Sequence, residues 1–171
     1  MNTQNSNNLN TAKRLIEVAD IRKAEQQYPA AVECYKSAVS FLMLASKEPN
    51  LEIGEQELIN GKLKQCIKEI INISKIWIKE NKAATKDQLY DVSRMLRQGY
   101  RDNNSNKQGN ANRKKFALMY AKMLINIYDE MLINTSKQSS DYLTLETEVG
   151  RFTNCVKALQ AEISAAQSLS V

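Results

Sequence analysis

The chain has 171 residues, a formal net charge of +5 and no histidine. This length suffices for one domain or two small lobes with a buried core. Two prolines and five glycines are too few for a turn-rich β protein, so the composition indicates an all-α chain. The absence of histidine excludes Ser-His-Asp and Cys-His nucleophile activation and histidine-containing zinc sites.

Other signs of catalysis are missing from the sequence as well. The chain has no phosphate-binding glycine motif, and its acidic pairs fall on polar helix faces. Cys34, Cys66 and Cys155 are far apart within apolar helical patterns, which is typical of reduced, buried cysteines in an intracellular protein. We therefore expect a protein that is not an enzyme and that has no cofactor and no metal site.

The first ten residues lack the apolar segment of a secretory signal, and the most apolar run, 67–78, is interrupted by charges. We expect a cytoplasmic protein without a transmembrane segment.

Three helices are predicted in the first half. Residues 1–10 read as a disordered polar tail, and a first helix opens near Asn10 or Thr11 and runs to about Gln26. The second runs from Pro29 to just before Pro49, with apolar or small residues on one side, including Ala31, Val32, Tyr35, Ala38, Val39 and Met43. The alanines let a neighbouring helix approach closely.

The third helix carries two apolar stripes. One steps by four and three residues and forms a seam that closes a bundle: Ile59, Leu63, Cys66, Ile70, Ile73 and Trp77. The other consists of Ile67, Ile71 and Ile78. An apolar arc this wide needs a second covering surface, which is either the rest of the chain or a partner helix.

The second half predicts three more helices. The first has Thr85 as a candidate cap, the next runs from about Arg113 to Thr135, and the last begins near Ser140. The polar stretch 102–112 is the best internal boundary by composition. We expect two packed three-helix lobes, residues 11–82 and 83–171.

Residues 9–80 resemble an MIT (microtubule-interacting and trafficking) domain. The segments AKRLIEVADIRKAEQQYPAAVECYKSAVSFLM and INGKLKQCIKEIINISKIW carry the likeness, through Ala19, Tyr28, Ala31, Tyr35, Ala38 and Lys62. The nearest likeness is the ESCRT-disassembling AAA ATPase. Tetratricopeptide hairpins share the small–aromatic pattern, but residues 62–95 show no second copy of it.

The resemblance implies an antiparallel three-helix bundle that binds short MIM segments of ESCRT-III subunits or related proteins in a groove between two helices. In the groove between the second and third helices, the matching positions are Lys62 and Ile67. We add Ile71 from the third helix and Val32, Val39 and Met43 from the second. Glu69 and Ile71 replace an arginine and a glutamate of the ATPase, which favours a more apolar ligand, a motif with basic residues, or a groove covered by the later helices.

Alternatives remain for the second stripe and for the second half. The second stripe could form the interface between the halves, in which case the groove lies between the first and third helices, near Ile16 and Ile59, or the site belongs to the second lobe. The second half would suit a divergent second MIT lobe, an arrangement that resembles the tails of autophagy-initiating kinases. The partner would then be an ESCRT-III-like or autophagy protein, with an endosomal or autophagosomal association.

A basic cluster supports a different class of function. Residues 86–115 carry eight basic and three acidic side chains. A solvated face is one interpretation, and recruitment to an anionic membrane or to nucleic acid is another, although the polar part of the cluster, residues 102–115, has no interleaved aromatic residues for base stacking. No nucleic-acid partner is expected. A structural subunit of a helical complex is a further alternative. The candidate surface residues are Arg94, Arg97, Arg101, Arg113, Lys114 and Lys115.

Overall fold

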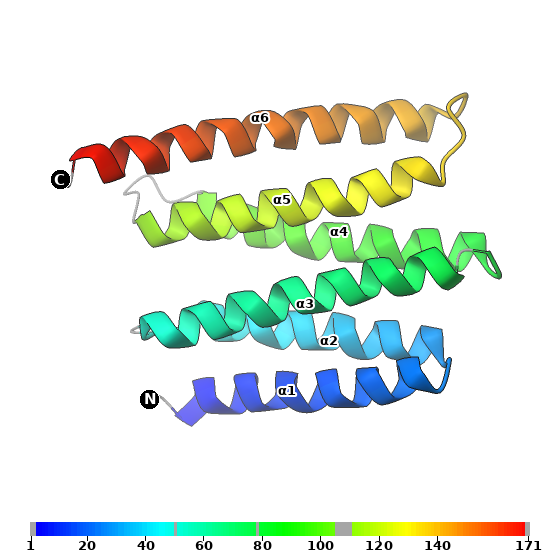
Figure 1. The fold of residues 1–171 in the computed structure, drawn as a ribbon, viewed down its shortest axis with the longest axis horizontal. Coiled ribbons are helices and arrows are strands. Elements are labelled where there is room, and N and C mark those ends of the chain that lie inside the picture. The colour runs from blue at the N-terminus through cyan, green and yellow to red at the C-terminus, as the bar shows by residue number, and fades with distance from the viewer. Residues whose placement is uncertain (1–2, 50, 78, 105–110, 170–171) are drawn as a thin grey trace. The chain divides into compact units, whose positions relative to one another are not determined.

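The computed structural model is all-helical over the residues that it describes, 3–49, 51–77, 79–104 and 111–169. The described part contains six helices and no strand, which confirms the predicted all-α helical-bundle class (Figure 1). Their bounds are α1 Thr3–Ala24, α2 Tyr28–Ser46, α3 Ile53–Trp77, α4 Lys82–Asn104, α5 Ala111–Ile133 and α6 Ser140–Leu169.

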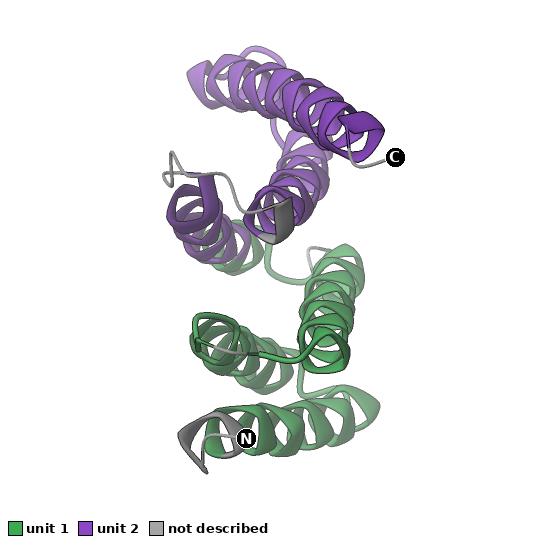
Figure 2. Cartoon of the chain, turned by 90° about the vertical axis from the view of Figure 1, so that its left-hand side faces the viewer, with its two compact units in different colours: residues 1–88 green, residues 89–171 purple. Residues whose placement is uncertain are grey.

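The chain divides into two compact units, residues 1–88 and 89–171 (Figure 2). The division falls inside α4, six residues beyond the expected boundary at 82, because α4 runs without a proline or a break from Lys82 to Asn104. The polar stretch 102–112 falls within the residue range of unit 2. Its flanks belong to α4 and α5, and its centre, 105–110, lies outside the described residues, as does Ile78.

α1 begins earlier than the sequence predicted. It starts at Thr3 rather than near Asn10, so residues 3–10 are helical and do not form the predicted disordered tail. Leu9 is 5% exposed and extends the buried stripe of Ala12, Ile16 and Ala19 by one turn. A single apolar residue among asparagines was too weak a signal to indicate this turn.

The start of α4 also differs from the prediction. Thr85 is buried inside the helix, and its hydroxyl donates to the Asn81 backbone carbonyl at 2.8 Å. Asn81 caps the helix instead, because its side-chain oxygen accepts from the Ala84 amide at 3.4 Å.

Unit 1 is organised around α2. α1 and α3 run in the same direction, and α2 runs antiparallel to both (Figure 1). α1 packs closely along α2 and α2 packs on α3, whereas α1 and α3 contact each other much more sparsely. Alanines explain the close pair: Ala12 and Ala19 of α1 and Ala31 and Ala38 of α2 are fully buried, and such small side chains let helix axes approach.

Unit 2 contains the rest of α4 with α5 and α6, and α5 packs along α6. Gly99 allows α4 and α5 to approach closely, because a Cβ atom there would lie 2.5 Å from Cε1 of the buried Tyr120. Phe152 of α6 is buried between two tyrosines. The Tyr100 ring of α4 meets it edge-on at 5.3 Å between centroids, and the Tyr128 ring of α5 stacks on it at 6.1 Å.

Candidate functional site

Three of the residues predicted to line a groove between α2 and α3 are buried in this structure. Val32 and Val39 are fully buried, and Ile67 is 2% exposed. Lys36 lies on the same face of α2 as the two valines, and its Nζ donates to Oε1 of Gln88 at 2.8 Å. Gln88 of α4, which belongs to unit 1, therefore lies beside this face of α2.

The three buried residues are assigned to the core of the described chain. Met43 and Ile71 remain partly exposed. The contact between Lys36 and Gln88 could not be predicted from the sequence, because nothing in residues 82–88 identifies α2 as their neighbour. Because Ile67 is buried, a charge at this position is expected to destabilise unit 1 rather than only block binding.

Lys62 does not lie on the same side of α3 as Ile67, although the resemblance placed them in one groove. Five residues separate them, which is roughly 140° around the helix axis. Burial raises the pKa of the Cys66 thiol to about 12, with the Lys62 charge acting against this rise and Asp20 and Glu69 adding to it. Lys62 precedes Glu69 by seven residues, and Glu69 pairs with Lys23 of α1, so Lys62 lies on the side of α3 that faces α1.

We define the α1/α3 face as the side of unit 1 where α1 and α3 lie next to each other. Polar side-chain contacts join the helices on this side. The ammonium of Lys23 on α1 pairs with the carboxylate of Glu69 on α3. The Tyr35 hydroxyl of α2 donates to the Asp20 carboxylate of α1. Burial raises the pKa of Tyr35, and the hydrogen bond to Asp20 and the nearby negative charges raise it further.

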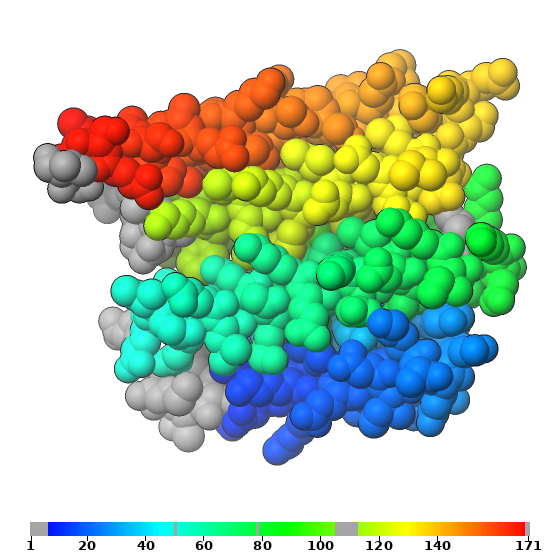
Figure 3. Space-filling view, viewed as in Figure 1, coloured from blue at the N-terminus to red at the C-terminus, as the bar shows by residue number. Residues whose placement is uncertain are grey.

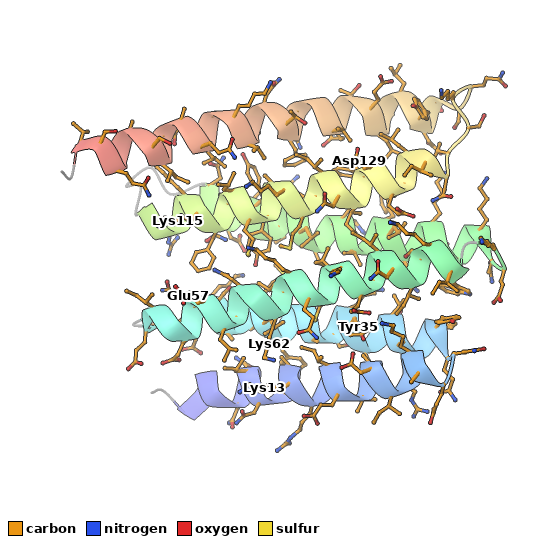
Figure 4. All side chains as sticks on the ribbon, in the orientation of Figure 1. Lys13, Tyr35, Glu57, Lys62, Lys115 and Asp129 are labelled. Atoms are coloured by element: carbon orange, nitrogen blue, oxygen red, sulfur yellow. The ribbon has the colours of Figure 1, made fainter. Side chains whose placement is uncertain are left out.

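The two residues predicted for the alternative groove are both buried. Ile16 is 5% exposed and Ile59 is 1% exposed. α1 and α3 form the near side of unit 1 in the space-filling view, with α2 largely behind them (Figure 3). Lys13 on α1 and Lys62 on α3 lie on this side, and Tyr35 lies farther along (Figure 4).

One stripe of α3 borders the α1/α3 face. Its members are spaced by four and three residues, which places them on one side of the helix, and the Lys23–Glu69 pair shows that this side faces α1. Apolar residues stand at the ends, with Leu58 41% and Ile76 47% exposed, and polar residues lie between them. The stripe consists of Leu58, Lys62, Gln65, Glu69, Asn72 and Ile76.

The predicted basic cluster is partly neutralised. Arg94 pairs with Asp91 and lies over the Tyr90 ring at 5.5 Å, and Lys114 pairs with Glu162 of α6 at 3.4 Å. Arg94, Arg97 and Arg101 share one face of α4 by their spacing. Within the described part of the chain, no ion pair to a carboxylate is seen for Arg97, Arg101, Arg113 or Lys115.

The sequence analysis identified each of these basic residues, but it predicted neither the Arg94–Asp91 pair nor the Lys114–Glu162 pair. The Lys114–Glu162 pair joins two helices and depends on the register of α5 against α6, which no local pattern gives.

An open hollow lies at the end of α5 and the start of α6. It is lined by Asp129, Leu132, Ile133, Thr135, Lys137 and Tyr142.

Among the described residues, no three potential metal ligands come together. None of the described helices has both the length and the apolar character needed to cross a bilayer. No protein-family model, curated protein or solved structure matches the chain.

Proposed function

We propose that the chain is a non-catalytic interaction module whose first unit binds a short segment of a partner protein along the α1/α3 face. The observation that carries this proposal is the contrast between the two sides of α3. The side of α3 away from α1 buries Ile67, whereas the side toward α1 leaves Leu58 and Ile76 about half exposed beside charged residues.

The kind of partner follows from the resemblance of residues 9–80 to an MIT domain. A bundle in which α1 and α3 run parallel on either side of α2 is compatible with that resemblance (Figure 1). We therefore propose a MIM-type segment of a membrane-trafficking protein, of the ESCRT-III or autophagy type. A cytoplasmic location, with recruitment to endosomes or autophagosomes, is part of the same proposal.

The exposed apolar area on this face points to a modest affinity. Leu58 and Ile76 already bury about half of their surface, so covering each one contributes about 1 kcal/mol. Lys62 adds one charge-assisted contact at the rim. Micromolar binding corresponds to about −8 kcal/mol, so the main-chain contacts of an ordered segment must supply part of the affinity.

Fluorescence anisotropy with labelled C-terminal peptides of ESCRT-III subunits tests this assignment on the full chain. We expect micromolar binding that falls about tenfold in Leu58→Asp and in Lys62→Glu. Ile71→Asp is the matched control, because Ile71 is partly exposed on the opposite side of α3. Loss of binding in Ile71→Asp alone would return the site to the α2/α3 side. No binding by the wild-type chain would refute the ESCRT-III assignment.

A further inference from the structure

Unit 2 buries a hydroxyl group that the fold leaves unsatisfied. Tyr128 of α5 is 3% exposed, and its hydroxyl oxygen has no hydrogen-bond partner among the described residues. The hydroxyl of the nearby Ser93 donates to the Tyr90 backbone carbonyl at 2.7 Å instead. Such a group is costly, because it has lost its bonds to water and gained none within the protein.

The aromatic cluster places this hydroxyl between α4 and α6. The Tyr128 ring stacks on Phe152 of α6, and the same Phe152 meets the ring of Tyr100 on α4. Arg97 precedes Tyr100 by three residues and follows Ser93 by four, so these three residues share one face of α4.

The charges around the hydroxyl are mostly positive. Burial raises the pKa of Tyr128. The charge of Arg97 acts against this rise, Glu148 adds to it, and the nearby Ser93 side chain and the charge of Arg151 also act against it. The single hydroxyl proton of Ser93 goes to the Tyr90 carbonyl, and the Tyr128 hydroxyl makes no hydrogen bond of normal geometry. Arg151 is already paired with Glu148 at 3.0 Å and lies over the Phe152 ring at 4.6 Å. Arg97 is therefore the cation beside the hydroxyl for which the described residues show no carboxylate partner.

Unit 1 contains a comparable buried tyrosine, Tyr35, whose hydroxyl has a hydrogen-bond partner. Tyr35 also lies on the middle helix of its unit, is fully buried, and donates to the carboxylate of Asp20 on the preceding helix. Next to Tyr128, the preceding helix offers Ser93 and Arg97 and no carboxylate that bonds with the hydroxyl.

We propose that a glutamate or aspartate side chain from an acidic helical segment of a partner protein binds between α4 and α6, accepting a hydrogen bond from the Tyr128 hydroxyl and pairing with Arg97. This carboxylate would fill the role that Asp20 fills in unit 1. The site lies in unit 2, so it does not rest on the function proposed for the α1/α3 face.

A helical segment fits this surface better than a membrane does. Arg97 and Arg101 lie one turn apart on α4, and glutamates at the same spacing on a second helix would match them, whereas Arg94 is already paired with Asp91. The Tyr128 hydroxyl is buried, so the partner would have to insert a single side chain beside Arg97 for its carboxylate to reach it. A planar lipid surface would contact the outer arginines and leave Tyr128 untouched.

Fluorescence anisotropy on the full chain tests the proposal with a defined probe. The probe is a labelled fifteen-residue helical peptide with glutamate at every third or fourth position, and its control is the same peptide with glutamine. We expect binding of the glutamate peptide only, weakened about tenfold by Tyr128→Phe and by Arg97→Gln. Arg94→Gln is the matched control, since it removes the same charge from an arginine that already pairs with Asp91, and its effect should stay within about twofold.

Three outcomes would overturn the proposal. The first is no binding of the glutamate peptide by the wild-type chain. The second is equal weakening by Arg94→Gln and Arg97→Gln with none by Tyr128→Phe, which would indicate a diffuse basic surface. The third is binding to phosphatidylserine vesicles that none of the glutamate peptide displaces and that Tyr128→Phe leaves unchanged, which would indicate membrane recruitment. Unchanged far-UV circular dichroism confirms that the variants fold.

Discussion

Removal of the Tyr35 hydroxyl tests how much one hydrogen bond between α1 and α2 contributes to the stability of unit 1. Tyr35→Phe keeps the buried ring and removes the donor to Asp20. A hydrogen bond to a charged group contributes about 1.5–3 kcal/mol, and because the Asp20 carboxylate is exposed and can bind water again, we expect the lower end, about 1.5 kcal/mol. Urea unfolding, followed by Trp77 fluorescence, measures it, since Trp77 is the only tryptophan and lies in unit 1.

The expected change is a fall in the urea midpoint of about 1 M, since domains of this size lose roughly 1–2 kcal/mol per molar urea. Asp20→Ala and the double variant complete a cycle whose coupling energy isolates the hydrogen bond. A loss below about 0.5 kcal/mol in Tyr35→Phe, or a coupling energy near zero, would refute the role assigned to this bond.

The same deletion in unit 2 is expected to act in the opposite direction. Tyr128→Phe removes a buried hydroxyl without a partner, so the free energy of unfolding should stay constant or rise by about 1 kcal/mol. Circular dichroism follows this unfolding, because both units contribute helix signal. A destabilisation of the size expected for Tyr35→Phe would show that the Tyr128 hydroxyl is satisfied within the unit.

Further substitutions and an alkaline titration test the fold. Gly99→Ala should destabilise unit 2 by about 1–3 kcal/mol in urea unfolding despite the better helix propensity of alanine, because the added Cβ meets the Tyr120 ring. Leu9→Ala should lower the stability of unit 1 by about 2 kcal/mol, whereas no change would mean that the first turns of α1 do not pack. Burial raises the pKa of Tyr100 to about 12 and also raises that of Tyr35, so the unfolded chain loses these protons first and stability should fall as pH rises above about 10. A fall that is as steep in Tyr35→Phe as in the wild type would contradict this assignment.

Much of the fold could be predicted from helical periodicity. The alanines and Tyr35 of α2, the seam of α3 from Ile59 to Trp77 and the start of α6 at Ser140 are as the sequence indicated. These features depend on local spacing, which a sequence shows directly. The start of α1 and the role of Gly99 could not be predicted, because they depend on which residues of another helix lie opposite.

The candidate site was less predictable than the fold. Periodicity shows that Ile67 lies on an apolar stripe, but it does not show that Ile67 is buried or that Gln88 of α4 lies beside Lys36 of α2. The resemblance placed Lys62 and Ile67 in one groove, although their separation of five residues already indicates different sides of α3. Nothing in the sequence indicated a role for Tyr128, because a buried hydroxyl without a hydrogen-bond partner is a property of the packed structure.

The two proposed sites lie in different units and should behave independently. Lys62→Glu should weaken binding of the ESCRT-III peptide and leave the affinity for the glutamate peptide unchanged, and Tyr128→Phe should do the reverse, because substitutions in separate units without shared partners have additive effects. Anisotropy titrations of both peptides with both single variants and the double variant measure this. If Tyr128→Phe weakened both peptides equally while the helix signal was retained, the peptides would share one site, and the assignment of a separate ligand to each unit would be wrong.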